Sequence, residues 1–196
     1  LQYPTLLNLK GYTAGPCFTY FIYDFCTNGT LESYLRLKMR FENKDIDTKD
    51  YILILGIAIT LKFLHSHNLI HYSLYPTNVF IDENFYPKIL GFQMSKKTFM
   101  MDIYSKDFFL NKEKVIYMLP PEFNHGQIFV PASNIYSLSY MIYEILTIGK
   151  LFNDGKESAL YIISNICKGA RPNASLIKNH KIAEFLQKCW EANPDS

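Results

Sequence analysis

The residues with the most chemical potential lie together in the stretch "HYSLYPTN", from His71 to Asn78. An imidazole, hydroxyls and an amide follow one another between two apolar runs, "KFLHSHNLI" and "VFID". A histidine can act as a catalyst or a metal ligand, whereas Ser73 has no basicity near neutral pH. The amide of Asn78 is a poor substitute for a carboxylate toward a hard dication. The stretch therefore gathers polar side chains between two apolar runs, but few of them are reactive groups.

Length and composition indicate one globular domain. The chain has 196 residues, of which 48% are hydrophobic and 19% charged, as in ordinary folded proteins. Its net charge of +2 comes from lysines scattered among carboxylates, so we expect no nucleic-acid partner. The most apolar run, "YILILGIAITLKFL", is interrupted by Lys62, whereas a bilayer span needs roughly twenty apolar residues. We therefore expect a buried helix there and no membrane span.

The cysteines and the N-terminus give expectations about the cellular compartment. The cysteines form no CxxC pair and no zinc-type spacing, and the N-terminus does not resemble a secretory signal. We therefore expect reduced thiols and a cytoplasmic protein. Because the chain opens on Leu1 rather than on methionine, we also expect it to be a fragment of a longer protein.

The first half of the chain changes from a strand pattern to a helical one. Residues 17–26, "CFTYFIYDFC", are aromatic and β-branched and predict a strand, paired in a hairpin with the preceding "LLNLKGY". From Thr30, "LESYLRLKM" predicts a helix. A second helix is expected to start at Thr48 as its cap and to end at Asn68 in the left-handed conformation. Its predicted apolar face consists of Ile52, Leu55, Ile59 and Phe63.

The second half predicts a short hairpin and then more helices. "NVFID" and "YPKIL" are separated by "ENF", which suits a tight turn. A poorly patterned stretch, roughly residues 93–119, follows as a long loop. Pro131 and Ser133 introduce a deeply buried helix that Gly149 is expected to end. Further helices are predicted over "ALYIISNICKG" and "KIAEFLQKCWEA". The predicted fold class is α+β, with a small β element leading into a helical body.

In this order, these segments resemble the protein kinase family along essentially the whole chain. "YDFCTNGTLESYL" is similar to the strand, hinge and helix that link the two kinase lobes, and "LIHYSLYPTNVFIDENFYPKIL" resembles the catalytic loop and its hairpin. "GFQ" stands in place of DFG, "PPEF" in place of APE, and "NIYSLSYMIYEIL" and "LQKCWEANPDS" resemble the central and closing helical segments. "GTLESYL" and the "CW" pair lean toward the tyrosine-kinase-like side of the family.

The resemblance implies that structural residues are kept. It assigns His71 a packing role beneath Phe92, the phenylalanine of the DFG-like segment. It makes Glu122 the partner of an arginine that would lie beyond Ser196, and it lets Asn134 accept backbone hydrogen bonds in place of an aspartate. The fold is therefore expected to persist.

The resemblance also implies that the chemical residues are lost. The catalytic aspartate is replaced by Ser73, the loop lysine by Tyr75, and the magnesium-binding aspartate of DFG by Gly91. The neighbouring arginine is Tyr72. Asn78 alone remains of the metal ligands, and it is a weak one. No catalytic residue is intact on this interpretation.

Nucleotide binding is a separate question. The resemblance places Tyr23 at the gatekeeper position, Phe80 beneath the adenine ring, and the hinge at Asp24, Phe25 and Cys26. The two aromatic rings can fill the pocket or stack on a purine. No cofactor is expected, and weak ATP binding, with or without magnesium, stays open. The glycine-rich loop, the ATP-binding lysine and the αC glutamate would lie before Leu1.

We therefore interpret residues 1–196 as a partial kinase-like domain, with the end of the N-terminal lobe and the hinge in 1–26 and the helical C-terminal lobe in 27–196. The leading hypothesis is a catalytically inactive pseudokinase that acts in signalling as a scaffold or allosteric partner. Its partners would be proteins: a kinase, a substrate or an adaptor. One alternative is an active kinase that uses substitute carboxylates such as Asp82, Glu83 or Asp102. Another is a decayed relic without a selected function.

Overall fold

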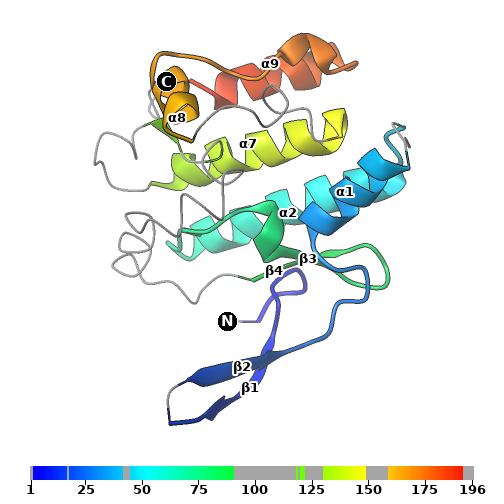
Figure 1. Ribbon diagram of the computed structural model, residues 1–196, viewed down its shortest axis with the longest axis vertical. Helices are drawn as coiled ribbons and strands as arrows, with labels where there is room; N and C mark the ends of the chain where they lie inside the picture. Colours follow the sequence, from blue (N-terminus) through cyan, green and yellow to red (C-terminus); the bar gives the residue numbers. More distant parts are fainter. Residues whose placement is uncertain are drawn as a thin grey trace.

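The computed structural model describes residues 2–16, 18–41, 45–90, 118, 120–121, 130–148 and 159–191. Helices are stacked into a body with a short hairpin at one side, and a second, longer hairpin projects away from this body (Figure 1). The fold class is α+β, as predicted. In the described part of the chain, no helix is both long and apolar enough to cross a bilayer.

The projecting hairpin consists of β1 (Leu9–Ala14) and β2 (Thr19–Tyr23), which pair antiparallel. This confirms the predicted hairpin, although β2 is shorter than the predicted strand over residues 17–26. The segment before β1 ties the hairpin to the body: Tyr3 stacks on Phe63 with ring centroids 4.0 Å apart, and the Leu7 N–H donates to the Ile89 carbonyl at 3.0 Å. The body therefore orients the base of the hairpin.

Helices α1 (Leu31–Arg40) and α2 (Thr48–Ser66) confirm two predicted helices. The predicted cap of α2 is wrong by one residue, because Asp47 caps the helix and Thr48 is its first residue. The Asp47 carboxylate accepts hydrogen bonds from the N–H groups of Lys49 at 2.8 Å and Asp50 at 3.2 Å. A charged acceptor suits the positive end of the helix dipole better than a threonine hydroxyl does.

The predicted buried face of α2 is also wrong. Leu55 and Ile59 are 60% and 50% exposed, and Ile52 and Phe63 are only partly buried. Because the helix is apolar nearly all round, hydrophobic periodicity does not single out one face. The face that packs into the core contains Leu53, Ile57, Leu61 and Leu64.

The end of α2 follows the prediction. Asn68 has a φ of 56°, the left-handed conformation that asparagine tolerates. Its N–H donates to the His65 carbonyl at 3.0 Å, and the Leu69 N–H donates to the Leu64 carbonyl at 2.9 Å. These two bonds form a Schellman motif, which satisfies the last carbonyls of the helix and turns the chain toward His71.

The short hairpin confirms the second predicted one. Strands β3 (Val79–Ile81) and β4 (Pro87–Ile89) pair antiparallel after the 3-10 turn η1 (Pro76–Asn78). The hairpin packs closely on α2, because a Cβ atom built on Gly56 would lie 2.6 Å from the Cδ atom of Pro87. A glycine at this point of the helix is therefore a packing requirement.

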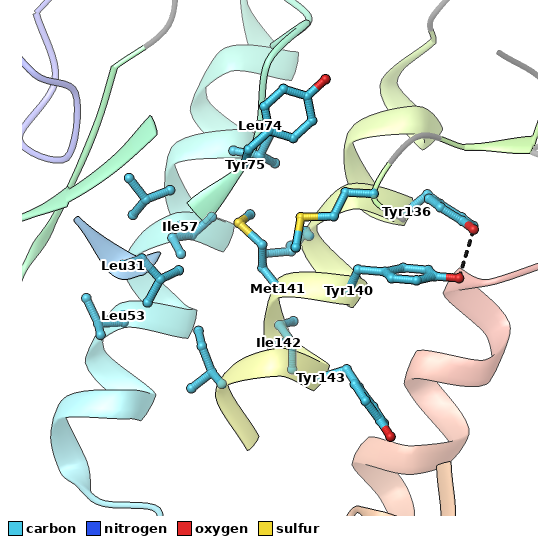
Figure 2. Packing of buried hydrophobic residues seen from close by; sticks show 14 of the residues in the cluster. Leu31, Leu53, Ile57, Leu74, Tyr75, Tyr136, Tyr140, Met141, Ile142 and Tyr143 are labelled. Atoms are coloured by element: carbon cyan, nitrogen blue, oxygen red, sulfur yellow. Dashed lines mark hydrogen bonds between the residues drawn. The ribbon is translucent and has the colours of Figure 1, made fainter. Parts of the chain in front are cut away.

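Helix α7 (Pro131–Thr147) is the buried helix that the sequence predicts. Figure 2 shows Met141 pointing toward α2, whereas Tyr140 and Tyr143 point toward the last helix. Its C-terminus differs from the prediction in one respect: Ile148, with a φ of 54°, takes the left-handed position at the cap. Gly149 lies outside the described residues, as does the loop predicted over residues 93–119 except for residue 118.

The C-terminal helices α8 (Ala159–Cys167) and α9 (His180–Cys189) confirm the last two predictions. Arg171 joins their ends, because its guanidinium donates to the Ile166 carbonyl at 2.9 Å and the Trp190 carbonyl at 2.6 Å. A cation at the negative ends of two helix dipoles is favourable. Cys26, Cys167 and Cys189 form no disulfide within the described part of the chain.

A buried ion pair joins α1 to α2. The Lys38 Nζ atom lies 2.6 Å from the Asp50 Oδ2 atom, and the side chains are 7% and 0% exposed. The Tyr34 hydroxyl donates to Asp50 Oδ1 at 3.1 Å, and the Asp47 N–H donates to Asp50 Oδ2 at 3.0 Å. Burial, together with the charge of Asp50, raises the pKa of Tyr34. The carboxylate thus has several partners, of which Lys38 is the cation.

Lys38→Met is expected to lower the free energy of unfolding by about 3–5 kcal/mol, because it leaves the Asp50 carboxylate buried without its cation. The matched control is Arg36→Met, since the Arg36 side chain is 65% exposed in its pair with Glu32. That pair should contribute at most about 0.5 kcal/mol. Urea denaturation measures both. Equal losses for the two variants would contradict a desolvated ion pair.

Gly56→Ala is expected to destabilise the protein by about 1–3 kcal/mol, because the new methyl group meets the rigid ring of Pro87. Helix propensity alone predicts the opposite sign, a gain of about 1 kcal/mol. Gly11→Ala is the control, since no atom lies within 4 Å of a Cβ built there. A more stable Gly56→Ala protein in thermal unfolding would show that α2 and β4 are not in close contact.

Candidate functional site

The candidate site is the loop from His71 to Asn78, which lies between the end of α2 and the start of β3. Asn134, in the first turn of α7 and 0% exposed, holds the start of this loop. Its Oδ1 atom accepts from the His71 N–H at 2.9 Å, and its Nδ2 atom donates to the His71 carbonyl at 2.6 Å. The loop is therefore fastened to α7 through both backbone groups of one residue.

The ring of His71 fastens the loop from inside. The side chain is 1% exposed; its Nδ1 atom accepts from the Ser73 N–H at 3.2 Å, and its Nε2 atom lies 3.3 Å from the Leu90 carbonyl. Since Nδ1 is an acceptor, the neutral ring carries its proton on Nε2 and donates to Leu90. Burial lowers the pKa of His71 to about 4. At neutral pH this imidazole is uncharged, and both of its nitrogen atoms are hydrogen-bonded to backbone groups.

Ser73 and Tyr75, at the positions that the sequence analysis associates with the base and the loop lysine, are both withdrawn from solvent. Their side chains are 5% and 3% exposed, and within the described part of the chain neither hydroxyl has a hydrogen-bond partner. Burial alone raises the pKa of Tyr75, which keeps the phenol protonated at neutral pH. A neutral hydroxyl is a poor general base near neutral pH.

Asn78 closes the loop upon itself. Its Nδ2 atom donates to the Ser73 carbonyl at 2.8 Å, and its own carbonyl accepts from the Leu90 N–H at 2.8 Å. Only the Oδ1 atom is then left for a metal. A hard dication such as magnesium prefers carboxylates, and the described residues contain no group of three metal-binding His, Cys, Asp or Glu side chains. The described residues of this loop do not fit a magnesium ion.

The nucleotide-pocket candidates lie along the hinge and on β3. The turn after the hinge is bonded to β3, because the Asn28 N–H donates to the Ile81 carbonyl at 3.2 Å and the Ile81 N–H donates to the Gly29 carbonyl at 2.9 Å. Thr30 also forms a bridge with Phe80. The structure therefore brings the segment that follows the hinge, residues 28–30, beside Phe80 and its strand.

The hinge side chains differ in exposure. Phe25 is 86% exposed, whereas Cys26 is 8% exposed, and burial is the main cause that raises the pKa of Cys26. Asp24 pairs with Lys10 at 3.0 Å on the surface. Tyr23 and Phe80 are both partly buried, so neither ring is wholly enclosed by the described residues.

Some predicted positions lie outside the described residues: Gly91, Phe92 and Glu122. The predicted packing of His71 beneath Phe92 and the predicted partner of Glu122 therefore stay predictions.

His65 contributes to the site and was missed by the sequence analysis. Its Nε2 atom lies 3.2 Å from Asn134 Oδ1, so the last turn of α2 contacts the same amide that holds His71. The donor bond from Asn134 to the His71 carbonyl was also missed. No sequence signal points to either contact, because 69 and 63 residues separate the partners.

Comparison with known proteins identifies the family to which this architecture belongs. The family model "Protein tyrosine and serine/threonine kinase" matches residues 1–196, and the chain belongs to the protein kinase family. The order of hairpin, hinge, helices and loop is that of a kinase-like α+β fold.

Several curated relatives are kinases with limited identity to this chain. They include "Cysteine-rich receptor-like protein kinase 44" from Arabidopsis thaliana, 30% identical over 96% of this chain and 52% of the relative. "Receptor-interacting serine/threonine-protein kinase 2" from Bos taurus is 26% identical over 99% of this chain and 38% of the relative. "Dual specificity protein kinase shkB" from Dictyostelium discoideum is 24% identical over 99% of this chain and 29% of the relative. The chain thus spans only about half or less of their lengths.

Because of His71, the free energy of unfolding is expected to decrease as the pH is lowered. The unfolded chain binds a proton near pH 6.5, whereas the folded ring, with a pKa of about 4, stays neutral. The contribution is fully present above about pH 6.5 and is lost as the pH falls toward 4, by on the order of 3 kcal/mol. Urea denaturation at stepped pH should give a shallower loss for His71→Gln than for the wild type.

His67→Gln is the control for this experiment, because His67 is exposed and its contacts among the described residues lie within the last turns of its own helix: the Phe63 carbonyl, the Phe63 ring and Ser66. The free energy of unfolding of His67→Gln should fall with decreasing pH as steeply as that of the wild type. An identical slope in His71→Gln would show that His71 is not the buried neutral histidine.

Proposed function

We propose that this chain is part of a pseudokinase, a kinase-like domain that does not transfer phosphoryl groups and instead acts in signalling as a scaffold or allosteric partner. One observation carries the proposal: the Ser73 hydroxyl, at the position of the catalytic base, is 5% exposed and has no hydrogen-bond partner in the described structure. A substrate hydroxyl would find neither a base nor access at this point.

The electrostatics of the loop support the same proposal. Phosphoryl transfer relies on positioning and on charge stabilisation by cations and metal ions. From His71 to Asn78 the loop contains no carboxylate, no lysine and no arginine, and its histidine is neutral because burial lowers its pKa. Loss of the general base alone typically lowers the rate by about two to four powers of ten. Loss of the metal ligands would add to this.

One of the nearby carboxylates that could substitute for the lost ones, that of Asp82, has another role. Asp82 Oδ1 accepts from the N–H groups of Asn84 at 3.0 Å and Tyr86 at 2.9 Å, which shapes the turn between β3 and β4. Its Oδ2 atom lies 3.5 Å from Lys88 Nζ. A carboxylate so engaged is unsuited to bind a metal ion, which weighs against the alternative of an active kinase with unusual ligands.

The hinge side is less altered than the loop. The kinase resemblance places the peptide groups of residues 24–26 and the rings of Tyr23 and Phe80 around an adenine ring, and both rings are partly buried, as a stacking surface requires. We therefore propose at most weak nucleotide binding that does not depend on magnesium. Binding of protein partners through the helical lobe, in the cytoplasm, would then be the selected role.

Thermal unfolding of the intact protein with ATP tests the proposal, separately with and without magnesium. A ligand that binds the folded state must raise the unfolding temperature. We expect no shift that requires magnesium, because the loop does not fit the metal. A phosphotransfer assay on the same preparation should give no magnesium-dependent product.

The variant Asn78→Ala distinguishes the alternatives. If the intact protein transfers phosphate with magnesium and Asn78→Ala abolishes this transfer, the chain belongs to an active kinase and the proposal is wrong. A weak thermal shift with ATP alone, unchanged in Asn78→Ala, would support a nucleotide-binding pseudokinase.

A further inference from the structure

The carboxamide of Asn134 both accepts a hydrogen bond from the loop and donates one to it. The Oδ1 atom accepts from the His71 N–H, and the Nδ2 atom donates to the carbonyl of the same residue. The side chain is 0% exposed. Water therefore cannot replace either bond, and a buried group that loses its partner is costly.

The backbone decides which end of the amide is which. A peptide N–H only donates and a peptide carbonyl only accepts. If the amide were turned over, its NH₂ group would face the His71 N–H and its oxygen would face the His71 carbonyl. Both bonds would be replaced by repulsion, so the observed orientation is fixed by His71 itself.

A carboxylate cannot make this pair of bonds. It has two acceptor oxygens and no proton to donate, so at position 134 one of its oxygens would face the His71 carbonyl, which lies only 2.6 Å from Nδ2. We propose that Asn134 is a positioning residue whose amide the loop requires, and that a carboxylate is rejected at this position at neutral pH. This inference goes beyond the proposed function and holds whether or not the chain is catalytic.

Its consequence concerns the loop as a whole. The kinase resemblance implies an aspartate at this position, whereas the loop of this chain offers Asn134 a carbonyl as well as an N–H. Bringing back the charged residue is then expected to harm the fold. The loop from His71 to Asn78 is held in a shape that depends on a neutral partner.

Two titratable side chains of the described residues bear on this amide. His65, at the end of α2, contacts Oδ1 at 3.2 Å, and His71 contributes its backbone while its ring faces Ser73 and Leu90. Protonated His65 would favour a carboxylate at 134. The ring of His71 titrates in every variant, so it cancels when a variant is compared with the wild type at the same pH.

The test is the pH profile of Asn134→Asp, measured on the intact protein as the equilibrium constant of unfolding in urea. The new carboxyl can donate to the His71 carbonyl only when protonated, which raises its folded pKa above the unfolded value of about 3.9. Stability is then retained at low pH and lost as the pH rises. We expect the variant to approach the wild type only below about pH 4, where the carboxyl is protonated in both states, and to be about 100-fold less folded near about pH 8.

A loss of stability with rising pH could come from the new carboxyl at position 134 or from His65. The variant His65→Gln separates these two sources, because glutamine can donate a hydrogen bond but does not titrate. In the double variant with Asn134→Asp, loss of stability with rising pH should persist. If it disappears, the proton resides on His65, the carboxylate is accepted beside the His71 carbonyl, and the proposal is overturned.

Two further variants complete the comparison. Asn179→Asp makes the same chemical change at the exposed N-cap of α9, where the side chain only accepts, from the Ile182 N–H at 3.3 Å. It should stay within about threefold of the wild type and gain slightly as the pH rises. Asn134→Ala should be destabilised equally at every pH. If Asn134→Asp instead matches the wild type, or shows the flat profile of the alanine variant, the amide is not specifically required.

A measurement on the wild type covers the case in which Asn134→Asp does not fold at any pH. In protein labelled with ¹⁵N-asparagine, the side-chain NH₂ of Asn134 should exchange with solvent far more slowly than that of exposed Asn179. Exchange at the rate of an exposed asparagine would overturn the proposal, because the donor bond to His71 would then be absent.

Discussion

The arrangement of the site depends on the contact between one side chain, Asn134, and one residue of backbone, His71. Through it the first turn of α7 holds the start of the loop, and His65 brings the end of α2 to the same point. The ring of His71 then fixes Ser73 and the end of β4. Each contact satisfies a buried polar group, which is why the loop is ordered although it binds no charge.

This network explains how the loop from His71 to Asn78 keeps its shape without any Asp, Glu, Lys or Arg side chain of its own. The contacts that shape the loop run largely to backbone groups: Asn134 to His71, His71 to Ser73 and Leu90, Asn78 to Ser73. A network of this kind does not depend on the charge of the residues at positions 73 and 75. The shape of the loop thus depends on backbone groups and on the side chains that bind them. The side chains at positions 73 and 75 can therefore change while the loop keeps its shape.

Much of the fold could be predicted from the sequence because its signals are local. Three predictions that depend on a few neighbouring residues each were confirmed: the strand over "TYFIY", the left-handed conformation of Asn68 and the buried helix α7. The cap of α2 and its buried face were not predicted correctly. A helix that is apolar on nearly every side carries no periodic signal, so only its neighbours decide that Leu53 is buried and Leu55 is exposed.

The sequence by itself determined the order of elements, the family resemblance and the residue types at the loop positions, since all of these follow from residues close together in the chain. Tertiary structure alone decided that the Ser73 and Tyr75 hydroxyls are buried without partners among the described residues, that Lys38 pairs with Asp50 in the interior, and that Asn134 donates as well as accepts. The physical reason is that desolvation and hydrogen bonding depend on which distant atoms surround a group. For Asn134 and His71 those atoms are 63 residues apart.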